Sequence, residues 1–272
     1  MTKSKKLEKL YLDLGDWLDS SLVFFMDLID EHGKPLALIQ RSGDVELLVN
    51  DFVYFCVTKS CRSLYAIKFL IEKKFAEDAL IILRSIYENY LSSTYVIHNP
   101  TALEYFIYNR IGLGVGILEH PITPKGKRDT RKVRNKNTEE TSSLFLSISD
   151  LARGTGIAED EELFSGLYNY LCQHTHSNMI SSGSYRNDNN TCYTYSPHDN
   201  TLQARYYTTL VMALWAQSLL AFPMLPKELK PHIILMTQKA KKLLIRDINI
   251  LSFSTVEELQ TVIPARLSRF IT

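Results

Sequence analysis

The stretch of sequence that decides the fold is residues 76–98, AEDALIILRSIYENYLSSTYVIH. It is followed by Asn99-Pro100, a pair that ends a helix because proline restricts the preceding residue and cannot continue the hydrogen-bond ladder. Drawn as a helix, the stretch carries aliphatic and aromatic side chains around nearly its whole circumference. Such a helix must be covered by protein on every side. We therefore expect residues 76–98 to form the central helix of a bundle.

Helical periodicity continues on both sides of this segment. Apolar residues recur at three- and four-residue steps over residues 7–31, and His32-Gly33-Lys34-Pro35 then ends the pattern. We expect further helices at about 44–74, 101–118, 144–154, 160–176, 201–222, 226–248 and 256–270. We expect a long polar loop at about residues 181–200. No β pattern of any length is convincing, although 192–195 could form one short strand.

The predicted fold class is all-α, a helical bundle with a long polar loop and a basic linker. Residues 1–118 hold the N-terminal helices and 119–143 form the basic linker. Residues 144–272 hold the C-terminal helices, which we expect to pack on the first set as one composite domain.

Composition and cysteine spacing point to a cytoplasmic protein without a metal or cofactor. Of 272 residues, 45% are hydrophobic and 22% charged, as in ordinary globular domains. The N-terminus lacks the apolar core of a signal peptide. No C-x-x-C pair, zinc spacing or Gly-rich phosphate loop is present, which fits reduced thiols, and the four cysteines are Cys56, Cys61, Cys172 and Cys192.

Residues 206–226 are uncharged and could span a bilayer by length. Their Thr, Gln, Ser and Pro residues favour a central core helix instead. We therefore expect no membrane association.

The charge distribution is uneven although the net charge is only +1. Residues 125–136 carry seven positive charges against one negative, so the remainder of the chain carries −5. A basic run in an acidic body predicts contact with nucleic acid or another anionic surface, and the alternative is a solvated, mobile loop. The candidate nucleic-acid-binding residues are Lys125, Lys127, Arg128, Arg131, Lys132 and Arg134, with Lys136 beside them.

Arg84 and Glu88 are the only charged residues between Asp78 and His98. Four residues apart, they share one helix face, and burying them is costly unless they are paired or solvated in a cavity. One interpretation is an ion pair that sets the packing register. The other is a polar cleft in which the pair holds a third group such as a histidine.

His174 and His176 are the candidate third groups, within Tyr170-Leu171-Cys172-Gln173-His174-Thr175-His176-Ser177-Asn178. Two residues apart on a helix, they point about 200° away from each other, so only one can face a given site. This spacing is weak for metal ligands, and no metal site is predicted. We consider Arg84, Glu88, His174 and His176 as catalytic candidates and, equally, as structural residues.

The sequence from Ala79 to Glu88, followed later by Tyr168-x-x-Leu171-x-x-His174-x-His176, resembles an uncharacterised family of bacterial helical domains with an Arg-Ser-x-x-Glu helix and a Tyr/His helix. It is also similar to the HEPN superfamily of toxins, abortive-infection proteins and defence ribonucleases. The resemblance covers roughly residues 45–220. HEPN ribonucleases carry an Arg four to six residues before the His, across a dimer interface. Here the nearest upstream Arg is Arg153.

This resemblance implies a HEPN-like protein of a bacterial stress or phage-defence system that cleaves RNA without metal as a homodimer. His174 or His176 would be the base, Arg84 the cation and Glu88 an orienting group, while the basic run holds RNA. Implied partners are RNA, a protein of the same defence system and a second copy of the chain. The alternative is a non-catalytic helical module that binds a partner protein or nucleotide.

Overall fold

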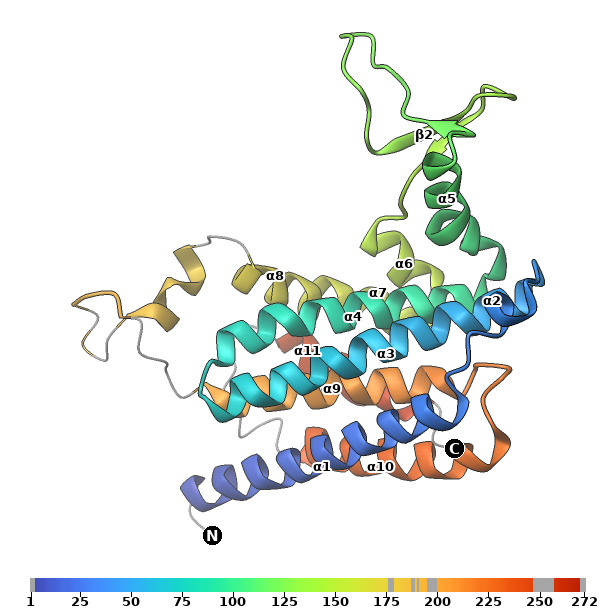
Figure 1. The fold of residues 1–272 in the computed structure, drawn as a ribbon. Coiled ribbons are helices and arrows are strands. Elements are labelled where there is room, and N and C mark those ends of the chain that lie inside the picture. The colour runs from blue at the N-terminus through green and yellow to red at the C-terminus, as the bar shows by residue number, and fades with distance from the viewer. Residues whose placement is uncertain are drawn as a thin grey trace.

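The computed structural model describes residues 3–175, 179–186, 189, 191–194, 200–246 and 257–269. Figure 1 shows a bundle of long helices from which a separate arm projects. The long helices are α1 (Lys3–His32), α3 (Val45–Glu72), α4 (Ala76–His98), α9 (Thr201–Leu219) and α10 (Lys230–Arg246). The shorter helical segments are α2 (Leu36–Gln40), η1 (Pro100–Ala102), η2 (Glu104–Tyr108), α5 (Asn109–Gly114), α6 (Ile148–Gly154), α7 (Ala158–Leu163), η3 (Phe164–Tyr168), α8 (Asn169–Thr175), η4 (Met179–Tyr185), η5 (Lys227–Leu229) and α11 (Glu257–Ser268). The predicted all-α bundle is confirmed.

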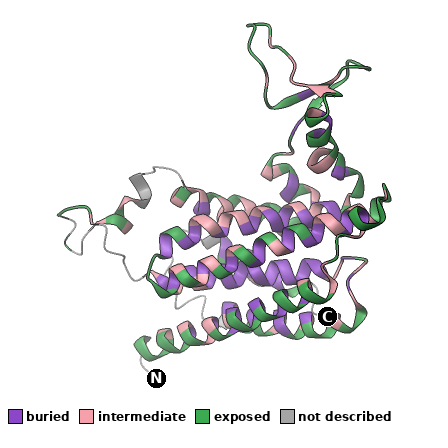
Figure 2. Cartoon of the chain, viewed as in Figure 1, coloured by how far each residue is buried: buried purple, intermediate pink, exposed green. Residues whose placement is uncertain are grey.

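The helix α4 occupies the centre of the bundle, as its apolar circumference predicts. It contacts α3 and α9, and α6 and α8 cover another side of it. Helices α1 and α10 form an outer layer on α3 and α9, and Figure 2 shows the buried surfaces turned toward each other between these layers. Leu83, Ile86, Tyr87, Tyr90 and Leu91 of α4 are all fully buried. The enclosure of α4 therefore determines where the other helices lie.

The uncharged segment 206–226 begins within α9, which is a core helix. Sixteen of the 19 residues of α9 are buried. No helix in the ranges given above is long and apolar enough to cross a membrane.

Residues 118–143 form the arm, and here the expectation that no strands would form was wrong. Strand β2 (Lys132–Asn135) pairs antiparallel with β1 (Leu118–Glu119) and β3 (Thr141–Ser143). The strands have two to four residues, and only Val133 among them is buried, so no alternating pattern exists to predict them. The arm stands on α5, where a Cβ on Gly112 would lie 2.7 Å from Leu118 Cγ. Close packing therefore requires glycine at this junction.

The predicted helix at 160–176 is interrupted by a π-helical turn. The turn, η3, lies between α7 and α8. A π turn holds more residues than an α turn and so shifts the side chains after it around the helix axis. Residues 176–178 lie outside the described part of the chain.

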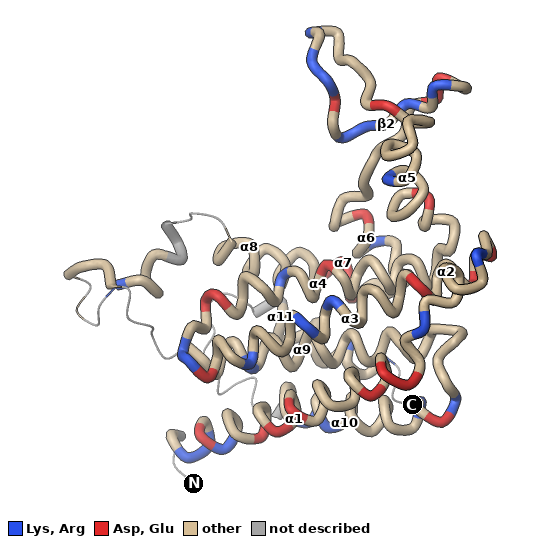
Figure 3. The backbone as a smooth tube through the Cα atoms, in the orientation of Figure 1, with Lys and Arg blue, Asp and Glu red and all other residues tan. Residues whose placement is uncertain are grey.

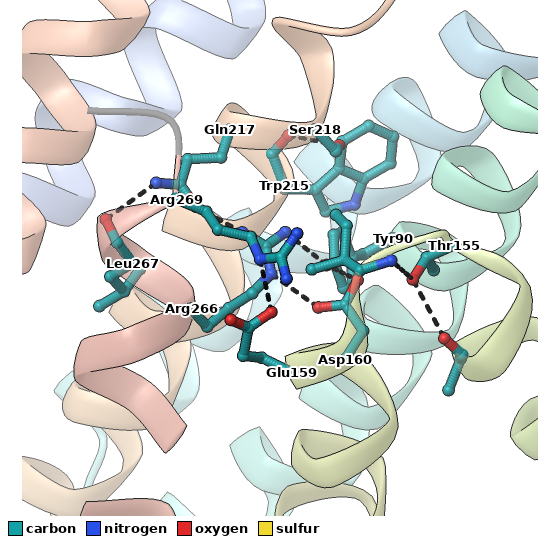
Figure 4. A network of polar contacts seen from close by, with 12 residues as sticks. Tyr90, Thr155, Glu159, Asp160, Trp215, Gln217, Ser218, Arg266, Leu267 and Arg269 are labelled. Atoms are coloured by element: carbon teal, nitrogen blue, oxygen red, sulfur yellow. Dashed lines mark hydrogen bonds and ion pairs between the residues drawn. The ribbon is translucent and has the colours of Figure 1, made fainter. Parts of the chain in front are cut away.

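A fully buried polar network joins four helices near the C-terminal end of the described chain (Figure 4). Arg266 of α11 donates to Asp160 Oδ1 at 2.7 Å, to Gln217 Oε1 at 2.8 Å and to the Tyr90 hydroxyl at 2.9 Å. The Tyr90 hydroxyl in turn donates to Asp160 Oδ2 at 2.7 Å. Arg266 and Asp160 are both 0% exposed. Burial acts to lower the pKa of Arg266, but Tyr90 and Asp160 outweigh it and raise the pKa. The network pins α11 to α4, α7 and α9.

Replacing Arg266 with methionine leaves the Asp160 carboxylate buried and unpaired. We expect Arg266→Met to lower the free energy of unfolding by about 3–5 kcal/mol, measured by urea denaturation. The control is Arg269→Met, which removes the half-exposed partner of Glu159 and should lower it by less than about 1 kcal/mol. Equal effects of the two substitutions would contradict the role assigned to the network.

Candidate functional site

The candidate site lies along the seam where α7, η3 and α8 run antiparallel to α4. Asp160 at the start of this segment contacts Tyr90, and Tyr168 in its middle contacts Glu88. The carboxylate of Glu77, near the beginning of α4, acts electrostatically on His174 near the end of α8. We call this line of contacts the α4–α8 seam. It brings polar groups from two distant parts of the sequence onto one side of the bundle (Figure 1).

Arg84 and Glu88 form the predicted ion pair on this seam. Arg84 Nε donates to Glu88 Oε1 at 2.9 Å. The side chains are 24% and 32% exposed, so the pair is half-buried rather than enclosed as expected, because α8 covers only part of this face of α4. Burial acts to lower the pKa of Arg84, but the hydrogen bond to Glu88 outweighs it, and the pKa is raised. The guanidinium is therefore a permanent cation that solvent can reach.

Among the described residues, the third member of this group is Tyr168. Its hydroxyl donates to Glu88 Oε1 at 2.9 Å, and the Arg84 guanidinium carbon lies 5.2 Å from its ring centroid. Burial, followed by the hydrogen bond to Glu88, raises the pKa of Tyr168. Tyr168 thus holds both charged side chains, one by hydrogen bonding and one through its ring. The sequence contains the Tyr168 motif, but the π turn that ends at Tyr168 makes the helix face it occupies unpredictable from α-helical spacing.

His174 lies elsewhere on the seam. Its ring is 5.0 Å from that of Tyr170, in an edge-to-face arrangement. Both ring nitrogens are covered by protein and have no hydrogen-bond partner in the part of the chain that the structure describes. Burial lowers the pKa of His174, and the Glu77 carboxylate opposes this shift. The lowered pKa makes the imidazole of His174 neutral at neutral pH.

The structure does not bring His174 into contact with the Arg84/Glu88 pair. Its charged neighbour is Glu77, seven residues before Arg84, which is about 10 Å along the axis of α4. Glu77 is 5% exposed and accepts a hydrogen bond from Asn200 Nδ2 at 2.7 Å. Sequence reasoning missed Glu77 because it precedes the apolar run. The signal for Glu77 is an acidic residue in the first turn of the central helix. The prediction for His176 falls outside the described residues.

The predicted nucleic-acid-binding residues all lie on the arm. Figure 3 shows their positive charge along its long loop and β2. Arg134 Nε donates to Glu119 Oε1 at 3.1 Å. The other cations of the basic run form no ion pair with any carboxylate in the described ranges. All of the cations in the run are exposed, namely Lys125, Lys127, Arg128, Arg131, Lys132, Arg134 and Lys136. The basic run is thus held away from the bundle.

A metal-binding group is not found along the seam. Across the ranges that the structure describes, no three His, Cys, Asp or Glu side chains are placed to hold a metal ion.

Residues 50–192 match a family of unknown function, DUF5677. The match spans 143 of the 272 residues, more than half of the chain, and the chain belongs to this family. It includes α4, the arm and the α4–α8 seam. No curated protein and no solved structure matches the chain.

The buried imidazole of His174 makes stability depend on pH. Its pKa is lowered from 6.5 in the folded state, so the unfolded chain binds the proton more readily. The stability is therefore fully present above pH 6.5 and falls as the pH drops from there toward the folded pKa. We expect the wild type to lose more stability than His174→Phe between pH 7 and 5, measured by urea denaturation. The exposed His98→Gln serves as control, and parallel pH profiles for wild type and His174→Phe would contradict the prediction.

Proposed function

We propose that this member of DUF5677 is a HEPN-like effector of a bacterial stress or phage-defence system that binds and cleaves RNA. The proposal is supported chiefly by one observation, that the arm and the α4–α8 seam lie on the same side of the bundle. The cationic arm projects from the side of the bundle on which α6, α7 and α8 cover α4 (Figure 1). One polyanionic strand lying along this side can touch the arm cations and the Arg84 guanidinium together.

RNA binding rests on the arm. Apart from Arg134, the cations of the basic run are exposed and form no ion pair within the described structure. Phosphates can therefore approach them without displacing a protein carboxylate. The sheet holds these cations on a defined support, which lowers the ordering cost of binding. The phosphate backbone, rather than any base, is the group that this surface recognises.

RNA cleavage rests on the seam. In the proposed reaction the ribose 2′-oxygen attacks the adjacent phosphorus and the P–O5′ bond breaks, giving a 2′,3′-cyclic phosphate and a 5′-hydroxyl. The neutral imidazole of His174 accepts the 2′-hydroxyl proton, and Arg84 stabilises the charge that develops on the phosphate oxygens. A water molecule gives the departing 5′-oxygen its proton, and the hydroxide formed takes the proton back from the imidazolium. Glu88 and Tyr168 are positioning residues for Arg84. Because the His174 nitrogens are covered and lie beside Glu77, about 10 Å along α4 from Arg84, RNA binding must both uncover the imidazole and bring it and the guanidinium to one phosphate.

The alternative function is a non-catalytic module that binds a partner protein or nucleotide. It is favoured by the same burial of His174 and by the pairing of Arg84 with Glu88 and Tyr168, which satisfies the cation internally. Under this alternative, the seam fixes the packing of α8 on α4. Substitutions there would change stability, and the purified protein would leave RNA intact.

The cleavage proposal predicts that substitution of either of two seam residues lowers the rate of RNA cleavage. Arg84→Gln and His174→Gln should each lower the cleavage rate by about 10²-fold or more while the far-ultraviolet circular dichroism spectrum is retained. The measurement is release of 2′,3′-cyclic phosphate ends from a single-stranded RNA in the presence of EDTA. Arg62→Gln, an exposed arginine on α3, is the matched control and should leave the rate unchanged. Absence of cleavage by the wild type would favour the non-catalytic alternative.

The arm predicts salt-dependent RNA binding. Lys127→Gln/Arg128→Gln/Arg131→Gln should weaken binding and reduce the slope of log K against log salt by about 2, since each phosphate contact on single strands contributes about 0.7. The measurement is fluorescence anisotropy with a labelled 20-nucleotide RNA over a salt series. The control, Lys59→Gln/Arg62→Gln/Lys73→Gln, removes three exposed cations from α3 and its C-terminus. Equal slopes for wild type and the arm variant would exclude the arm as the RNA-binding surface.

A further inference from the structure

The outer face of the bundle contains an acidic groove between α1 and α10. It has a volume of about 620 Å³. Its apolar floor includes Phe24, on which the ring of His232 is stacked at 5.0 Å, and the 57% exposed Val23. The carboxylates of Asp19, Asp27 and Glu31 rim it. We call this the α1 groove.

The negative charge of this groove belongs to a longer surface. Residues 10–31 of α1 contain six acidic residues and no Lys or Arg. Asp19 is engaged by Lys68 of α3, whereas Asp27 forms no ion pair with any residue that the structure describes. A surface of this composition attracts a cationic segment that also carries an apolar side chain.

The arm ends in a segment with this combination, residues 121–128, the arm tip. Backbone hydrogen bonds from Thr123 to Lys127 and from Gly126 to Thr123 close the loop, and Gly126 has a φ of 73° that suits glycine. Ile122 bridges to Arg128 and is 65% exposed. The exposed Ile122 is thus presented beside Lys125, Lys127 and Arg128 in a preformed loop.

The arm tip cannot reach the α1 groove of its own chain. Figure 1 shows the arm projecting from the side of the bundle opposite α1 and α10, with α3, α4 and α9 in between. Any contact between the two surfaces must therefore form between two molecules.

We propose that the arm tip of one copy docks in the α1 groove of a second copy. Lys125, Lys127 and Arg128 meet the carboxylates of Asp27 and Glu31, and Ile122 covers the exposed Val23. Because the two surfaces differ and lie on opposite sides of the molecule, the contact is heterologous. It extends into chains or closes into rings rather than forming a two-fold dimer.

The contact has a consequence that rests on the proposed function. The same arm cations would hold RNA, so RNA and the α1 groove of a neighbour compete for the tip. Self-association would then keep the arm occupied, and RNA would release it.

A charge exchange between the two surfaces tests the docking directly. Sedimentation velocity in 50 mM salt without RNA should give an average mass that rises with protein concentration, and 500 mM salt should lower the association constant about tenfold or more. The arm variant Lys127→Glu/Arg128→Glu and the groove variant Asp27→Lys/Glu31→Lys should each stay monomeric alone. Mixed, they should associate again, because each reversed surface meets its complement. Lys59→Glu/Arg62→Glu on α3 is the matched control and should associate like the wild type.

The outcomes separate this proposal from the proposed function. A wild type that stays monomeric at low salt, or a mixture that does not associate, overturns the docking and leaves RNA binding by the arm untouched. Loss of association in the groove variant alone, with the arm variant still associating, also overturns it, since another segment would then occupy the groove. Association that RNA does not reduce, together with restored association in the mixture, supports the docking while counting against RNA binding at the tip.

Discussion

The enclosure of α4 is the constraint on which the rest of the structure depends. A helix with apolar side chains around its circumference is stable in water only when protein covers each side of it. Helices α3 and α9 cover two sides, and the short segments α6 and α8 cover a third only partly. The ion pair of Arg84 and Glu88 lies on this incompletely covered side. The candidate site therefore lies on the side of α4 that the neighbouring helices cover least.

The polar groups along α4 differ in how far they are closed to solvent and paired. At Tyr90 the network with Asp160 and Arg266 is closed to solvent and every charged group has several partners, which makes it a structural element. About two turns away, Arg84 is accessible to solvent. Near the beginning of α4, the two ring nitrogens of His174 on α8 have no hydrogen-bond partner among the residues that the structure describes. Polar groups that are accessible or lack a partner are available for binding and catalysis, whereas closed hydrogen-bond networks stabilise the fold.

Periodicity predicted the long helices because each has enough turns to show its buried face. It also placed Arg84 and Glu88 on one face, since a four-residue separation within one helix determines that directly. The strands of the arm were missed because two to four mostly exposed residues carry no alternating pattern. The distance between His174 and the Arg84/Glu88 pair could not be predicted, because the relative register of two helices, one with a π turn, is set by side-chain packing. Arg266 was missed because its partner Asp160 lies 106 residues away.

This separation of 106 residues also bears on how the protein is made. A ribosome adds about 5–20 residues per second, so Arg266 is synthesised roughly 5 to 20 s after Asp160. During that interval the carboxylate and the Tyr90 hydroxyl on the emerging chain lack the cation that later joins them. The polar centre of the bundle can close only after α11 has left the ribosome. Until then, water or a bound chaperone must solvate the carboxylate and hydroxyl that the guanidinium will later contact.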